Sequence, residues 1–183
     1  MLTEHNGAKL IITGPPGAGK TTAIAQISEI APISTEVLAT DALAEEKQQT
    51  TVGLDFGRVT LHDGESIALY GTPGQVRFSF MWSILLEGAE GVIILVNHQR
   101  PDPLADLTEF VHFFAAHLAG GRAVVGISRH DDAQGPRLDE YAAVLDTAGC
   151  PAPVLAIDVR QRDDVLLLIE SLALLGETAG AVH

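Results

Sequence analysis

A glycine-rich run near the start of the chain carries its strongest chemical signal. Residues 14–21 read GPPGAGKT, which fits the pattern G-x-x-x-x-G-K-[ST] between an apolar run and a stretch with helical spacing. Glycines allow the backbone to curl so that amide hydrogens face phosphate oxygens, and a helix N-terminus attracts the same anion. Lys20 supplies a positive charge for the outer phosphates, and the hydroxyl of Thr21 is a suitable ligand for Mg²⁺.

This run predicts a site for magnesium and a nucleoside triphosphate, and it does not distinguish guanine from adenine. The residues that we expect to contact the nucleotide there are Gly14, Pro15, Pro16, Gly17, Ala18, Gly19, Lys20, Thr21 and Thr22. Lys20 is also expected to act in catalysis, because its charge lies against the phosphate that would be transferred.

Two polar loops further along could respond to the same phosphates. Residues 32–51 form a polar stretch that ends in Thr50 and Thr51, and residues 71–75 read GTPGQ after an apolar run. A threonine in a loop and a glycine at a strand end can each hold a terminal phosphate and release it after cleavage. This arrangement favours a two-state switch.

The elements that would position these residues alternate between strands and helices. Strands are predicted at 9–13, 54–61, 65–70, 91–96, 123–127 and 154–157, and helices at 19–31, 78–86, 104–118, 138–148 and 163–175. Such alternation predicts an α/β chain with the three-layer P-loop NTPase fold. We expect one domain over residues 1–183, with a six-stranded, mostly parallel sheet, one antiparallel edge strand and residues 32–51 as an exposed connection. The turn His62-Asp63-Gly64 would join the antiparallel pair.

Composition and charge exclude several other classes of protein. The formal net charge is −13, from 24 acidic and 11 basic residues, and such a surface repels nucleic acid and anionic lipid. Cys150 is the single cysteine, so neither an intrachain disulfide nor a cysteine cluster for zinc can form. Without a signal-peptide pattern, a lipidation motif or an apolar run of about 20 residues, we expect a cytoplasmic protein with no direct membrane insertion.

The order of these motifs resembles the Ras-like small GTPases, in particular the bacterial branch related to gliding-polarity and conservon-type GTPases. The resemblance covers nearly the whole chain and rests on 50–57 (TTVGLDFG), 71–78 (GTPGQVRF), 128–131 (SRHD) and 158–165 (DVRQRDDV). It implies that Thr51 closes over the γ-phosphate and magnesium. It also implies that Gly74 offers its amide to the γ-phosphate, and that Gln75 orients the attacking water.

The resemblance implies a base site as well. Asp131 would accept hydrogen bonds from the N1–H and 2-amino groups of guanine, and Arg129 would lie along the base and ribose. Val159 and Arg160 fall in the last loop, where the family contacts the base through backbone groups. Ser128 stands where the family has Asn, which predicts fewer bonds to neighbouring loops. His130 is expected to be exposed.

Gly71 is the main departure, because the family has Asp there to hold a magnesium-bound water. We hypothesise that Asp55 substitutes for it as a residue of the metal site, together with Thr21 and Thr51. The alternative is that Asp55 is a solvated carboxylate at a strand edge.

The favoured function is a GTP-binding regulatory switch with slow, partner-stimulated hydrolysis and with Mg²⁺ and GTP or GDP as ligands. Arg77 could reach inward as an arginine finger, although an exposed arginine that contacts a partner fits better. The resemblance implies a roadblock-type activating protein, with a sensor kinase or a polarity complex as further candidates. Two alternatives stay open. One is a degenerate nucleotide-binding module without turnover, suggested by Gly71 and Ser128, and the other is an ATP-dependent phosphotransferase.

Overall fold

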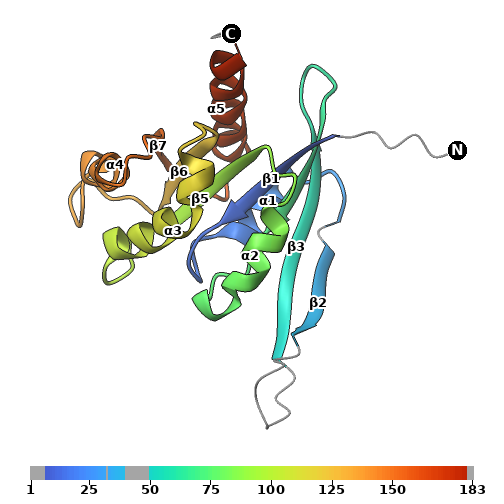
Figure 1. Cartoon of the computed structure of the whole chain (residues 1–183), viewed down its shortest axis with the longest axis horizontal. Helices are drawn as coiled ribbons and strands as arrows, with labels where there is room; N and C mark the ends of the chain where they lie inside the picture. Colours follow the sequence, from blue (N-terminus) through green and yellow to red (C-terminus); the bar gives the residue numbers. More distant parts are fainter. Residues whose placement is uncertain (1–6, 32, 40–49, 181–183) are drawn as a thin grey trace, which may run out of the picture.

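Apart from three consecutive strands after the first helix, strands alternate with helices along the described residues, and these strands join one sheet (Figure 1). The computed structural model describes residues 7–31, 33–39 and 50–180, with backbone only at 34–39, 50–52 and 177–180. The strands are β1 (Ala8–Thr13), β2 (Ile33–Ala39), β3 (Thr50–Thr60), β4 (Ser66–Gly71), β5 (Gly91–Asn97), β6 (Ala123–Ser128) and β7 (Val154–Ile157). The helices are α1 (Lys20–Ile27), α2 (Ser79–Leu86), α3 (Pro103–Leu118), α4 (Leu138–Thr147) and α5 (Arg162–Gly180), and a 3₁₀ turn, η1 (Val76–Phe78), precedes α2.

The α/β fold with a mostly parallel sheet is confirmed, but over the described residues the sheet has seven strands rather than six. Its order is β2-β3-β4-β1-β5-β6-β7, and β3 runs antiparallel to both of its neighbours. The additional strand is β2, which lies in the stretch that we expected to be an exposed connection. It pairs with the first half of β3, so the edge strand is β2 and the antiparallel strand lies inside the sheet.

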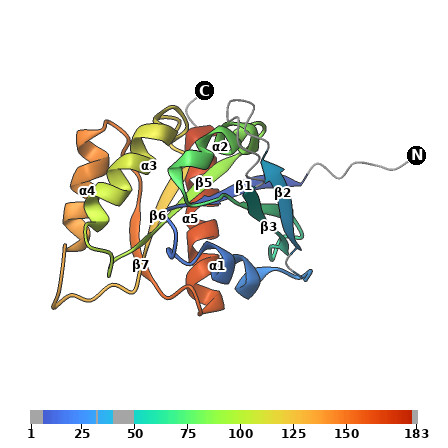
Figure 2. The ribbon, with the colours of Figure 1, turned by 90° about the horizontal axis from the view of Figure 1, so that it is seen from below.

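Helices cover the two faces of the sheet, as the view from below shows (Figure 2). Side chains alternate along a strand, so Leu10 and Ile12 of β1 face one helix layer while Ile11 faces the other. The first layer is formed by α1 and α5, and the second is formed by α2, α3 and α4. Both faces are therefore buried, as expected for strands in a parallel sheet.

This topology brings the functional loops to one edge. The strands β1, β4, β5, β6 and β7 are parallel to one another, so the loops that follow them leave the sheet at their carboxyl ends. Within the part of the chain that the structure describes, no helix combines the length and the apolar character needed to cross a bilayer.

Candidate nucleotide site

The glycine-rich run forms a loop between β1 and α1, as the motif predicts. Gly14 has a φ of 140°, and a Cβ there would lie 2.0 Å from the Leu95 carbonyl oxygen, so only glycine fits this position. The Ala18 amide donates to the Pro15 carbonyl at 3.2 Å, which closes the turn. Helix α1 begins at Lys20 and aims its N-terminus into the same loop.

Ser128 holds this loop from β6. Its side chain is buried, and its hydroxyl donates to the carbonyl oxygens of Ala18 at 3.0 Å and Val96 at 3.3 Å. Asn97, at the end of β5, donates its side-chain amide to Gly17 at 3.3 Å. The sequence predicts fewer bonds to neighbouring loops from Ser128 than from the Asn of the family pattern. A hydroxyl is nevertheless long enough here, because β6 ends directly beside the phosphate loop.

Lys20 is buried at the base of the loop, with 9% of its surface exposed. Its ammonium donates to the carbonyl oxygens of Gly14 at 2.7 Å and Pro15 at 2.9 Å. Burial lowers the pKa of Lys20 to about 8, and the negative charge of Asp55 partly opposes this shift. The buried ammonium of Lys20 has lost contact with water, and phosphate oxygens bound in the loop would replace the water that it lacks.

Thr21 and Asp55 meet on the α1 side of β3. The Thr21 hydroxyl donates to Asp55 Oδ2 at 2.5 Å. Across the β3–β4 ladder, Asp55 pairs with Gly71, and a Cβ on Gly71 would lie 3.0 Å from the Asp55 Cβ. The carboxylate of Asp55 thus occupies space next to the position where the small-GTPase pattern has an aspartate. The backbone of Thr51 lies in β3, while its side chain is outside the described residues.

The residues present fit a magnesium ion bound together with nucleotide. The described residues contain no group of three or more His, Cys, Asp or Glu side chains that could hold a metal. Mg²⁺ in phosphate sites takes few protein ligands and completes its shell with phosphate oxygens and water. One hydroxyl and one carboxylate, from Thr21 and Asp55, match that requirement.

The loop after β4 packs directly on the phosphate loop. A Cβ on Gly74 would lie 2.6 Å from the Pro16 nitrogen and 2.8 Å from Lys20 Nζ. Two contacts fix this approach. The Thr72 hydroxyl is 2.8 Å from that of Thr13, and the Trp82 indole donates to the Pro73 carbonyl at 2.8 Å. The aromatic segment thus supplies an anchor for this loop as well as core packing.

Gln75 is exposed and bonded to a neighbour. Its side-chain oxygen accepts a hydrogen bond from Arg77 Nε at 2.7 Å, and the Arg77 guanidinium lies 4.7 Å from the ring centroid of Phe78. Phe78 and Met81 are buried, whereas Phe80 is 51% exposed. The oxygen of Gln75 that could orient a water molecule is therefore engaged by Arg77 in this structure.

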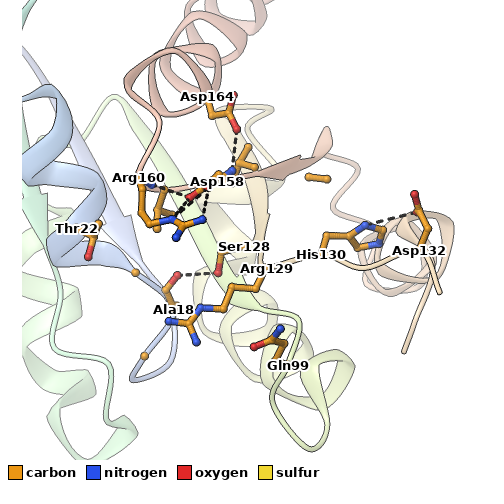
Figure 3. Close-up of a pocket in the computed structure, with 15 residues that line it drawn as sticks. Ala18, Thr22, Gln99, Ser128, Arg129, His130, Asp132, Asp158, Arg160 and Asp164 are labelled. Carbon is orange, nitrogen blue, oxygen red and sulfur yellow. Dashed lines mark hydrogen bonds and ion pairs between the residues drawn. The ribbon is translucent and has the colours of Figure 1, made fainter. Parts of the chain in front are cut away.

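A cavity of about 860 Å³ continues from the phosphate loop across the ends of β6 and β7 (Figure 3). Several residues that the sequence predicts to contact the nucleotide line this cavity: Gly17, Ala18, Gly19, Thr22, Arg129, Val159 and Arg160. Arg160 is paired with Asp158 at 2.7 Å, and Val159 packs against Gly19. This pairing lowers the pKa of the Asp158 carboxyl to about 2.

The 129–135 loop differs from the expectation at two residues. Asp131 is exposed, accepts a hydrogen bond from the Ala133 amide at 2.9 Å and is not among the lining residues. His130, expected to be exposed, has a side chain that is only 7% exposed and points toward Asp132 (Figure 3). Gln99 and Asp132 also line the cavity, and no local sequence signal marks either of them.

Comparison with known proteins agrees with this geometry. Residues 12–134 match the family described as conserved hypothetical ATP binding protein. The chain is 26% identical over 117 residues to intraflagellar transport protein 22 of Chlamydomonas reinhardtii, covering 62% of this chain and 56% of that protein. It is 29% identical over 98 residues to an uncharacterized protein of Methanocaldococcus jannaschii, covering 53% and 55%. The chain spans just over half the length of these curated relatives.

Two solved structures share the fold. The G domain of the T. maritima FeoB iron transporter superposes with a TM-score of 0.63 at 18% identity, covering 92% of this chain and 98% of that one. The cytosolic domain of the same transporter in its GMPPNP form gives 0.62 at 20% identity, covering 94% and 64%. The fold is thus that of a GTPase-like P-loop protein.

Proposed function

Because the chain belongs to the family described as conserved hypothetical ATP binding protein, it binds a nucleotide, and we propose that it is a GTP-binding switch with slow, partner-stimulated hydrolysis. The observation that carries this proposal is the contact between Thr21 and Asp55 opposite Gly71. It supplies a carboxylate at the end of the nucleotide where a switch senses the γ-phosphate.

In this proposal, Thr21 and Asp55 hold Mg²⁺, and Lys20 holds the outer phosphates. The metal would neutralise negative charge on the β- and γ-phosphate oxygens. Gly74 offers its backbone to the γ-phosphate, since it already packs against Pro16 and Lys20. Loss of that phosphate would remove one of the contacts that hold this loop against the phosphate loop, so the surface from Val76 to Leu86 would change between the two states.

The Gln75–Arg77 contact supports slow hydrolysis without a partner. The Gln75 oxygen would accept a hydrogen bond from the attacking water, and in this structure the bond from Arg77 Nε at 2.7 Å restrains the orientation of the Gln75 side chain. A partner that binds the Arg77 guanidinium would free Gln75. The exposed side chains Val76, Phe80 and Ile84 lie four residues apart along η1 and α2, and they give such a partner an apolar surface. We propose a roadblock-type protein for this role.

Guanine is proposed on the resemblance at residues 128–131 and on the likeness of the fold to a G domain, and it requires that Asp131 turns from the Ala133 amide toward the base. Adenine is the competing base, in line with the description of the family. A module that binds nucleotide without turnover is the second candidate, because Gln75 is engaged by Arg77.

A carboxylate exchange between the two strands tests the proposal. Asp55→Ala should weaken Mg²⁺-dependent GTP binding by roughly tenfold or more, as the loss of a metal-site partner does elsewhere. In the double variant Asp55→Gly with Gly71→Asp, the carboxylate moves to β4, and the contact between the two Cβ positions at 3.0 Å is removed. The close contact that remains, 2.9 Å from Ile24 Cδ1, is with the flexible end of a side chain. Most of the Mg²⁺-dependent affinity should return in this variant.

The measurement is competitive binding of GTP and ATP with Mg²⁺ and with EDTA, followed by single-turnover release of phosphate. Asp63→Asn removes an exposed carboxylate in the β3–β4 turn and serves as the control. Unchanged Mg²⁺ dependence in Asp55→Ala would show that Asp55 is not part of the metal site. Tighter binding of ATP would refute the choice of guanine, and GTP binding without phosphate release would favour the module without turnover.

A further inference from the structure

His98 is not one of the residues that line the nucleotide cavity, yet both of its ring nitrogens are hydrogen-bonded to neighbouring elements. It follows β5 directly and is 5% exposed. Its backbone amide donates to the Ser128 carbonyl at 3.0 Å, which ties the end of β5 to the end of β6. None of the roles described above for the phosphate or base end uses this residue.

Both ring nitrogens of His98 have partners on different elements. Nδ1 lies 2.8 Å from the hydroxyl of Tyr141 in α4, and Nε2 lies 2.5 Å from the Gln134 carbonyl oxygen. A carbonyl oxygen can only accept, so Nε2 carries the hydrogen and donates it. In the neutral ring, Nδ1 then accepts from Tyr141, whose pKa is raised to about 12 by burial, so that its hydroxyl keeps its proton.

The loop that lines the cavity is folded around this ring. The ring centroid of His130 lies 4.7 Å from that of His98. Gly135 has a φ of 81°, and a Cβ there would lie 2.9 Å from His98 Nε2. The Gln134 amide donates to the Asp131 carbonyl at 3.1 Å. Gln134, which His98 contacts, is therefore bonded to the part of the loop that lies next to the cavity.

We propose that His98, supported by Tyr141, is a positioning residue for base selectivity, holding the 129–135 loop through Gln134 and His130. Without this support, Arg129 and its neighbours would lose their position relative to the base, while the phosphate loop would keep its own supports at Ser128 and Asn97. This inference rests on the proposed function, because it requires that the cavity discriminates between bases.

The test compares base selectivity with overall affinity. In the wild-type protein the dissociation constant for ATP should exceed that for GTP. In His98→Ala the ratio of these two constants should fall about tenfold, which corresponds to about 1.4 kcal/mol of lost discrimination. The affinity for inorganic tripolyphosphate should stay the same. Tyr141→Phe leaves the Gln134 contact in place and should give a smaller change in the same direction.

A second pair of variants keeps the test decisive if His98→Ala does not fold. Gly135→Ala disturbs the same contact from the side of the loop, while Gly121→Ala places alanine at a comparable φ of 72° with nothing within 4 Å. The selectivity should fall in Gly135→Ala and not in Gly121→Ala.

Two results would overturn the positioning role: wild-type selectivity in folded His98 or Gly135 variants, or equal weakening of nucleotide and tripolyphosphate binding. A wild-type protein that binds GTP and ATP equally would instead refute the proposed base preference, and this inference with it.

Discussion

The phosphate end and the base end of the site depart from the small-GTPase pattern in different ways. At the phosphate end, Gly71 lacks a carboxylate, and Asp55 supplies one from the opposite position of the same ladder. At the base end, Ser128 keeps the bond to the phosphate loop from its own position, while Asp131 turns to the Ala133 amide. The first end is built from neighbouring strands and backbone, whereas the second depends on a loop held by residues far away in sequence.

The difference suggests how each end tolerates change. Strand pairing fixes Asp55 relative to Gly71, so a functional group can move across the ladder with little displacement. A loop has no such register, and its position follows from side-chain contacts such as those of His98 and Tyr141. We therefore expect substitutions at the phosphate end to affect hydrolysis and substitutions at the base end to affect selectivity.

The largest effect is expected from Gly74→Ala, which attacks the phosphate end. The new Cβ would lie 2.6 Å from the Pro16 nitrogen and 2.8 Å from Lys20 Nζ, so the loop must move away from the γ-phosphate. Loss of one such backbone donor slows comparable reactions about hundredfold. We expect a fall of this size in single-turnover GTP hydrolysis, with little change in GDP affinity.

Gly176→Ala is the matched control, because a Cβ at that position in α5 meets nothing within 4 Å. If Gly74→Ala hydrolyses GTP at the wild-type rate, the loop after β4 does not contact the γ-phosphate, and the comparison between the two ends loses its basis.

How much of this could be predicted from the sequence also differs between the two ends. The phosphate loop was predicted because its pattern is local, and the β3–β4 hairpin was confirmed. Asp55 and Gly71 are equally far in sequence from Asp63 in the turn, so the hairpin register could have placed them opposite each other. Strand β2 was missed because its pairing with β3 is a tertiary contact and its surroundings are polar. The His130 ring lies 4.7 Å from that of His98, and no local sequence pattern links these two residues.

A second prediction concerns the pH dependence at Lys20. Its pKa is lowered to about 8 by burial, and bound phosphates would raise it, so nucleotide binding should take up a proton above about pH 8. GTP affinity should then fall by up to about tenfold per pH unit as the ammonium loses its proton.

The free energy of unfolding of the nucleotide-free protein should instead rise with pH. Between about pH 8 and 10.5 the unfolded chain binds the additional proton, so this contribution stabilises the fold as the pH rises.

Calorimetric titration of GTP in two buffers of different ionisation enthalpy would measure the proton uptake directly. Lys20→Met removes the titrating group and should abolish it. Proton uptake that persists in Lys20→Met would assign the effect to another group and separate it from the phosphate end.

The smallest effect is expected from Ser128→Ala, which determines to which end this residue belongs. Ser128 lies in the base-end motif, but its hydroxyl bonds to Ala18 in the phosphate loop and to Val96 in β5. Loss of a net hydrogen bond of about 0.5–1.5 kcal/mol should weaken binding by roughly two- to tenfold. Binding of GTP, ATP and tripolyphosphate should be weakened equally, because the phosphate loop rather than the base loop is loosened.

Equilibrium competition with the three ligands measures this, with Ser171→Ala in α5 as the control for loss of a single hydroxyl contact. A selective loss of GTP would instead place Ser128 with His98 at the base end, so that the two ends would share one support.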